Sequence, residues 1–149
     1  MPKSATTEIA DAITTSLNGA VFSRPFTAVR SRRPSFRLQD LETVRVSVVP
    51  VAVESALADR ARDRGLHKVQ VWVQQRVGGA EGDGIDDAEF DALDYLCQEI
   101  DDHFRHKRLP GYQQAAWQRT ERQPLYWPAH LDRQGVFTGV VTLTYSLVR

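Results

Sequence analysis

VFTGVVTLTYSLV, residues 136–148, is the most regular stretch of the sequence. Large apolar side chains alternate there with small hydroxyl-bearing ones, namely Phe137, Val141, Leu143, Tyr145 and Leu147 against Thr138, Thr142, Thr144 and Ser146. A period of two in β-branched and aromatic residues is typical of a strand that buries one face. The stretch therefore predicts a long strand with one side in a hydrophobic core.

Two shorter stretches upstream repeat this period of two. Residues 44–48 alternate valine with polar residues and stop at Pro50, and residues 69–73 place three valines on one side of the chain. The single large residue on the opposite side of the second stretch is Trp72. Both patterns predict strands with one buried face.

The other extended segments are less regular. Residues 25–33, followed by Pro34, and residues 115–122 both favour extended chain. Residues 54–64 contain one large hydrophobe, Leu57, so we expect a solvated loop there rather than a helix. The connections between strands are mostly too short or too irregular for helical crossovers. The sequence therefore predicts a mostly antiparallel sheet of four to five strands.

Two segments have the spacing of amphipathic helices. The first begins at Ser4 or Thr6, ends at Asn18-Gly19 and carries Ile9, Ile13 and Leu17. The second begins at Asp86 or Asp87 and ends at Leu109-Pro110-Gly111, and its apolar stripe is Phe90, Leu93, Cys97, Ile100 and Phe104. We therefore expect two main helices packed on the sheet, in a single α+β domain over residues 1–149 with a mobile glycine-rich loop at about 78–86.

Composition restricts the class of protein. The chain has 149 residues, of which 42% are hydrophobic and 26% charged, as in an ordinary globular domain. No apolar run approaches the roughly 20 residues that cross a bilayer, so we expect no membrane contact. The one cysteine, Cys97, excludes an intrachain disulfide and lies in the apolar pattern of a helix, which indicates a buried side chain.

No motif for catalysis or cofactor binding stands out. His103 and His106 are spaced so that both could reach one metal ion, but histidines near the C-terminal end of a helix commonly lie on its solvated side. The glycines at 78–84 lack the Lys-Ser/Thr pair of a phosphate-binding loop. We therefore predict a protein that is not an enzyme, with no catalytic, cofactor-binding or metal-binding residues.

Charge is segregated along the chain although the net charge is zero. Residues 24–37 carry five arginines and no acid, and residues 81–102 carry ten acids and no base. The arginine segment could be a solvated strand edge, a strip that contacts nucleic acid, or a surface that pairs with the acidic segment of a neighbouring copy. The interface candidates are Arg30, Arg32, Arg33, Arg37, Asp83, Asp86 and Asp87.

Aromatic residues add three further interface candidates. Trp72 lies on the otherwise polar side of its predicted strand, so a helix, a loop or a partner must cover it. Tyr126 and Trp127 lie in a loop bracketed by Pro124 and Pro128. Loop aromatics are enriched at interfaces, but a loop that folds back over its own sheet is equally ordinary.

In their order and residue composition, these segments resemble those of a class of small proteins encoded among phage head–tail and tail genes. The stretches that carry the resemblance follow a short N-terminal helix and are FSRPFTA (22–28), VRVSVVP (44–50), HKVQVWV (67–73), DALDYL (91–96), PAHLD (128–132) and FTGVVTLTY (137–145). The order of elements is similar to that of phage tail terminator proteins, whose α+β subunits form a hexameric ring on the tail tube.

The resemblance implies a homo-oligomeric ring in the virion, at the junction of tail and neck, with the host cytoplasm as the place of assembly. It implies the tail tube protein and a neck or head-completion protein as partners, with passive contact to DNA in the lumen. A head-closure or neck adaptor ring is the alternative at the same junction. A small nucleic-acid-binding protein that uses Arg24 to Arg37 is the alternative from another class.

Overall fold

The computed structural model describes residues 2–34, 37–79 and 84–149. The predicted C-terminal strand is β6 (Val136–Val148), and it lies inside a six-stranded sheet of order β1-β2-β3-β6-β5-β4. Six strands exceed the four to five that we expected. β1 (Ala28–Arg30) lies inside the extended segment predicted at 25–33, and the unpredicted strand is β4 (Arg108–Leu109), which is too short to show a period in the sequence.

The centre of the sheet is antiparallel, as predicted. β3 (Asp63–Arg76) pairs along β6 from Arg64↔Val148 to Arg76↔Val136. β5 (Tyr112–Glu121) pairs with the other edge of β6, and β4 adds to β5. β1 is parallel to its neighbour, β2 (Arg45–Leu57), so the sheet is mixed at this one edge of the described structure.

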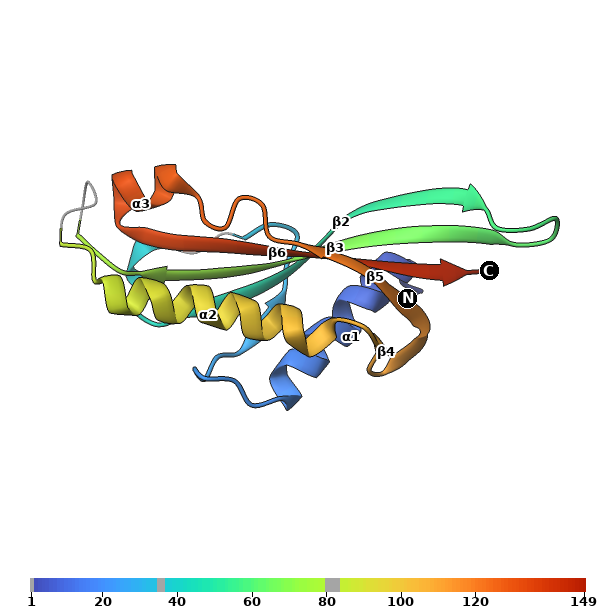
Figure 1. Cartoon of the computed structure of the whole chain (residues 1–149), viewed down its shortest axis with the longest axis horizontal. Helices are drawn as coiled ribbons and strands as arrows, with labels where there is room; N and C mark the ends of the chain where they lie inside the picture. The colour runs from blue at the N-terminus through green and yellow to red at the C-terminus, as the bar shows by residue number, and fades with distance from the viewer. Residues whose placement is uncertain (1, 35–36, 80–83) are drawn as a thin grey trace.

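The expected loop at 54–64 is wrong. β2 continues past Pro50 to Leu57 and pairs with β3 as far as Leu57↔Asp63, with an irregularity between Pro50 and Ala52. The turn at its tip is held by Asp59, whose carboxylate accepts hydrogen bonds from the N–H groups of Ala61 and Arg62. This hairpin extends beyond the helices (Figure 1), and every residue from 51 to 64 is exposed.

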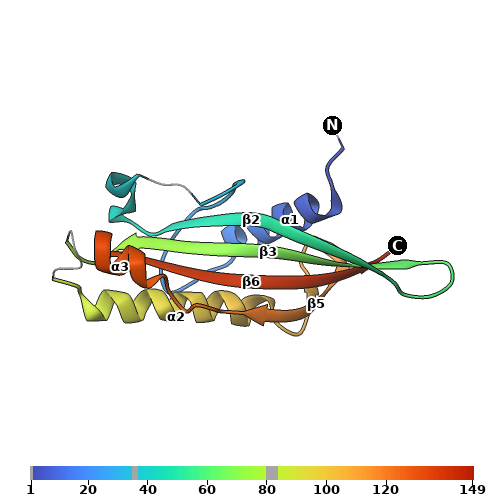
Figure 2. The ribbon, with the colours of Figure 1, turned by 90° about the horizontal axis from the view of Figure 1, so that it is seen from above.

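The two main helices are confirmed. α1 (Ala5–Gly19) is capped by Ser4, and α2 (Asp87–Phe104) by Asp86, whose carboxylate accepts from the N–H groups of Ala88 and Glu89. Both helices cover the same face of the sheet (Figures 1 and 2). α2 ends earlier than we expected, because His106 adopts a left-handed φ of 61° and the chain then enters β4.

Two short helical elements were not predicted. α3 (Pro128–Gln134) lies on the face opposite α1 and α2 (Figure 1), begins at Pro128 and ends at Gly135, whose φ is 64°. The 3₁₀ helix η1 (Leu38–Glu42) precedes β2. Both contain few large apolar residues, so neither shows a helical stripe. The predicted mobile loop falls partly on residues 80–83, outside the described residues, and beside it Val77 and Gly78 donate N–H groups to the carbonyl of Gly135.

The core lies between the two main helices and the sheet. Its members include Ile9, Ile13, Leu93, Ile100, Phe104, Val71, Val141 and Tyr145. Gly139 of β6 makes room for α2, since a Cβ at this position would lie 2.8 Å from Cys97 Sγ. Cys97 is buried, and burial raises the pKa of its thiol to about 12. No helix in the described ranges has the length and apolarity to cross a membrane.

The core packing predicts the effect of a cavity in α2. Ile100 is fully buried, and truncation to alanine leaves a cavity against the sheet. We expect Ile100→Ala to lower the free energy of unfolding by about 2–5 kcal/mol in urea titration. The control is Gln98→Ala, on the exposed side of the same helix, which should change it by less than about 0.5 kcal/mol. Equal effects of the two substitutions would contradict this packing.

Candidate interaction surfaces

The arginine segment divides into residues that pair within the chain and residues that do not. Arg24 Nη2 lies 2.6 Å from Glu89 Oε1 of α2. This hydrogen bond is the main cause that lowers the pKa of Glu89. Arg30 Nε lies 2.5 Å from Asp11 Oδ1 of α1. Two of the five arginines therefore fasten the segment to the helices of the same chain.

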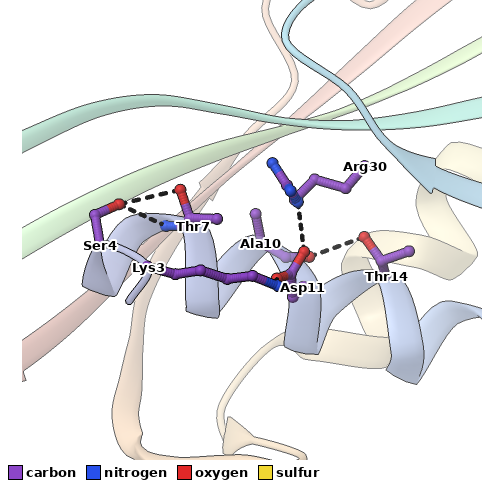
Figure 3. Close-up of polar contacts among 7 residues, drawn as sticks. All are labelled: Lys3, Ser4, Thr7, Ala10, Asp11, Thr14 and Arg30. Carbon is purple, nitrogen blue, oxygen red and sulfur yellow. Dashed lines mark hydrogen bonds and ion pairs between the residues drawn. The ribbon is translucent and has the colours of Figure 1, made fainter. Parts of the chain in front are cut away.

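Asp11 lies between two cations (Figure 3). Lys3 Nζ donates to its Oδ2 at 2.8 Å, while Arg30 approaches from the other side. Partial burial alone would raise the pKa of Asp11, but Lys3 and Arg30 together outweigh this and hold the pKa below its usual value. The interface candidate Arg30 is thus already engaged in tying β1 to α1.

The other arginines of the segment face solvent. Arg32, Arg33 and Arg37 are exposed and form no ion pair within the described part of the chain. Arg45, at the start of β2, is also exposed and donates only to the main-chain oxygen of Asp40. We call these four side chains the arginine surface. Arg45 was not among the residues predicted from the sequence, because only the fold brings the start of β2 beside Asp40.

The acidic segment also divides into residues that pair within the chain and residues that do not. Asp83 lies outside the described residues, and Asp86 is used as the cap of α2. Of the other acids, Asp94 pairs with Arg122, and Glu99 accepts from the backbone N–H and the hydroxyl of Ser23. These contacts hold the loops against α2 and leave few acids free for a partner.

Three exposed acids form a stripe on the outer side of α2. Asp87 and Asp91 are exposed and unpaired among the described residues, and Asp102 lies 3.8 Å from Arg105. Tyr95 stands between them with 54% of its surface exposed. We call Asp87, Asp91 and Asp102 the acidic stripe. The helical spacing opposite the apolar stripe could have identified Asp91, Tyr95 and Asp102 in the sequence.

The arginine surface and the acidic stripe lie near opposite edges of the sheet. β1 and β2 form one edge of the sheet, while α2 runs along the half that contains β6 and β5 (Figure 2). Arg32 and Arg33 follow β1, Arg37 caps η1 and Arg45 begins β2, so all four belong to this edge of the sheet and not to α2, which carries the acidic stripe. Arg24, which is not part of the arginine surface, reaches α2 through Glu89.

The aromatic candidates pack mainly against their own chain. Trp72 stacks on Trp127 with ring centroids 6.2 Å apart and planes 13° apart, so the loop before α3 covers it. Tyr126 lies edge-on to Phe90 of α2 at 5.0 Å. Trp127 keeps 38% of its surface exposed. Of the three, Trp127 alone offers an aromatic surface to a partner.

The histidines with metal-ligand spacing do not meet. His103 Nε2 lies 2.9 Å from Ser16 Oγ of α1, whereas the ring of His106 packs on Trp117 of β5. No group of three or more His, Cys, Asp or Glu side chains within residues 2–34, 37–79 and 84–149 is placed to hold a metal ion. A third histidine, His67 of β3, has its Nδ1 2.7 Å from Thr6 Oγ1 and joins the start of α1 to the sheet.

The β2–β3 hairpin forms a surface that sequence analysis missed. Every residue from 51 to 64 is exposed, and we call this segment the arm. Val53 is 55% exposed and Leu57 is 74% exposed, although neither lies in a loop. The alternation of Val51 and Val53 beyond Pro50 was the available signal, but a proline normally ends a strand and so obscured it.

The two partly buried histidines predict a pH dependence of stability. Burial lowers the pKa of His67, with a further contribution from Arg149, and burial and then Lys107 lower the pKa of His103. A pKa below the ordinary 6.5 means that folding favours the neutral ring. This stability is present above pH 6.5 and is lost as the pH falls through that value toward the lowered pKa.

We therefore expect the free energy of unfolding to fall on acidification below neutral pH, as measured by urea titration at a series of pH values. His67→Asn keeps a polar group near Thr6 without a group that titrates in this range, and His103→Gln does the same near Ser16. The double variant should lose less stability than the unsubstituted protein over the same pH interval. An identical pH slope in the two proteins would refute the contribution of these histidines.

Comparison with known proteins provides no family from which to transfer residue roles. No protein-family model matches the chain, and no curated protein matches it significantly. The assignment of function therefore depends on the charged surfaces, the arm and the resemblance found in the sequence.

Proposed function

We propose that this chain is a structural virion protein, a subunit of a homo-oligomeric ring that terminates the tail tube of a long-tailed phage. The observation that carries the ring is the placement of an exposed arginine surface and an exposed acidic stripe on opposite sides of one sheet. A closed ring repeats a single head-to-tail contact, so each subunit needs two different and complementary surfaces.

Charge complementarity sets the expected geometry of the contact. Arg32, Arg33, Arg37 and Arg45 of one subunit face Asp87, Asp91 and Asp102 of the next. Exposed ion pairs contribute only about 0–1 kcal/mol each, so these contacts select the partner and its orientation more than they determine the affinity. Trp127 and Tyr95, both partly exposed, are apolar groups that a neighbour or a tail component could cover.

The assignment to a tail is supported by the resemblance to tail terminators. In that role the ring contacts the tail tube protein on one side and a neck or head-completion protein on the other, in the virion and with six copies. DNA passes through the lumen without specific recognition. A head-closure or neck adaptor ring uses the same head-to-tail contact, and the two roles differ in whether the ring binds the end of the tail tube.

A second candidate function, nucleic-acid binding, is favoured by the exposure of Arg32, Arg33 and Arg37. Phosphates attract such a cluster in any sequence context, and binding of this kind weakens steeply as salt is added. The two functions differ in the state that binds. An isolated monomer that binds duplex DNA tightly favours the second candidate over the ring.

Charge reversal tests the ring contact. We expect Arg32→Glu, Arg33→Glu and Arg37→Glu together to raise the concentration needed for assembly about tenfold or more, as measured by sedimentation at low salt. Arg133→Glu, an exposed change on α3, serves as the control. When this variant is mixed with a second variant that carries Asp87→Arg and Asp91→Arg, part of the assembly should be restored. Unchanged assembly with unchanged salt dependence would remove the charge contact.

The tail role has a separate test. Purified protein added to polymerising tail tube protein should appear as a ring at one end of each tube in negative-stain images and should stop further elongation. Tubes that grow at the same rate to the same length, with bare ends, would overturn the terminator assignment. A ring that binds a head-completion protein but not the tube would support the neck adaptor instead.

A further inference from the structure

We propose that the arm pairs, strand to strand, with β5 of a second copy of this chain, joining the sheets of neighbouring subunits. The pairing uses Val51 to Val53 on the free edge of β2 and Trp117 to Arg119 in the part of β5 that extends beyond β4. It deepens the ring proposed above and rests on it in taking the partner to be another copy.

The free edge of the arm is an unprotected strand. β1 pairs with β2 only at Val46, Ser47 and Val48, with one more hydrogen bond from Ser31, so no described strand lies beside residues 51–57. Sheet edges in proteins are usually blunted by charges, prolines or a covering element. After Pro50, the arm edge has one charged side chain, Glu54, among Val51, Ala52, Val53, Ala56 and Leu57. Its backbone N–H and C=O groups therefore remain available for a partner.

Other edges of the sheet are blocked by side chains. Asn18 accepts from the N–H of Ala28 and donates to its carbonyl, which occupies the outer edge of β1. Arg108 donates to the carbonyl of Gln113 in the first half of β5. The second half of β5 carries no such cover in the described structure, because β4 pairs only with Tyr112 and Ala116. These two open segments are at opposite edges of the sheet.

The directions of the strands suit the pairing. β2 is antiparallel to β3, β3 to β6, and β6 to β5, so β2 and β5 run in opposite directions. A copy related by rotation about an axis along the strands keeps these directions. Its β5 therefore meets the arm in antiparallel orientation, which allows the regular ladder of an antiparallel sheet. The open segments overlap in height at Val51 to Val53 and Trp117 to Arg119. Val53, His67, Tyr145 and Trp117 lie in one row, and Ala52, Lys68, Thr144 and Arg119 lie in the next.

Charge favours β5 over a second arm. Two arms paired antiparallel about their centres would bring the two Glu54 side chains together, and like charges opposite one another destabilise a sheet. The β4–β5 edge is basic instead, because Lys107 and Arg108 are exposed beside a shallow hollow that they line with His106, Ala116 and Trp117. Glu54 thus finds opposite charge at this edge. The polarity is reversed relative to the arginine surface and acidic stripe, which helps to set the orientation of the subunits.

The size of the contact explains why the charged surfaces are also needed. Three residues of strand extend about 10 Å, and with side chains about 10 Å deep they bury on the order of 100 Å². A stable interface buries about 800 Å² on each partner. The arm therefore needs a second contact, and the arginine surface and acidic stripe lie at the same two edges of the sheet.

Single-cysteine exchange tests the pairing. Ser55→Cys places a thiol on the arm, and Gln118→Cys places one on β5, both at exposed positions. The native Cys97 is buried with a thiol pKa of about 12, so it remains unreactive in the folded protein. With a short bismaleimide linker, we expect cross-linked dimers when the two variants are mixed, and none from either variant alone. A protein that carries both substitutions should give a series of cross-linked oligomers whose largest member has the number of subunits in the ring.

Substitutions that change exposed side chains and leave the backbone hydrogen bonds of the arm intact test the same contact. Val53→Lys with Leu57→Lys changes only exposed side chains and should raise the assembly concentration about tenfold or more. Leu125→Lys, at a loop position 52% exposed, is the matched control and should leave it unchanged. Circular dichroism and urea titration verify that each variant is folded.

The outcomes separate the two proposals. Cross-links from the Ser55→Cys variant alone would replace arm-to-β5 pairing with arm-to-arm pairing and overturn the inference. An intact ring without cross-links in the mixture overturns the arm contact and leaves the ring. Cross-links in the mixture, with no binding to tail tubes, support the arm contact and remove only the terminator role. A protein that stays monomeric at every concentration overturns the arm contact and the ring together.

Discussion

The antiparallel pairing of β3 with β6 is the constraint on which the rest of the structure depends. The two strands stay in register from Arg64↔Val148 to Arg76↔Val136. Because side chains alternate along a strand, this register places the valines of β3 and the large residues of β6 on one face and the polar residues on the other. α1 and α2 then cover the apolar face, and Gly139 allows α2 to come close enough for Cys97 to pack on β6.

The same pairing makes the sheet longer than the helices that cover it. β3 and β6 extend beyond the start of α1, where His67 and Thr6 meet, and β2 and β3 continue further as the arm (Figure 2). A two-stranded ribbon without a covering layer is only marginally stable alone, so the arm depends on the central strands for its own order. Its exposed valines and leucine are therefore a property of the fold that calls for a partner.

Charge in this chain has both an internal and an external use. Arg24 with Glu89 and Arg30 with Asp11 hold the irregular segment before β2 against the helices. Once these pairs are made, the remaining arginines and acids are found at opposite sides of the sheet. Segregation along the sequence is thus converted into segregation across the molecule, which is the form of asymmetry that a head-to-tail assembly requires.

By itself, the sequence determined the elements whose side chains alternate between core and solvent, namely β6, the inner parts of β2 and β3, and helices α1 and α2. It also placed the start of α2 at Asp86 or Asp87 and predicted that Cys97 is buried. Only the tertiary structure decided the arm, α3, the edge strand β4, the parallel pairing of β1, the cover of Trp72, and which arginines remain free. The physical reason is that hydrophobic periodicity reports burial within one segment. Strand pairing at an edge, a stacked tryptophan and an ion pair depend on residues that are distant in the sequence and adjacent only after folding.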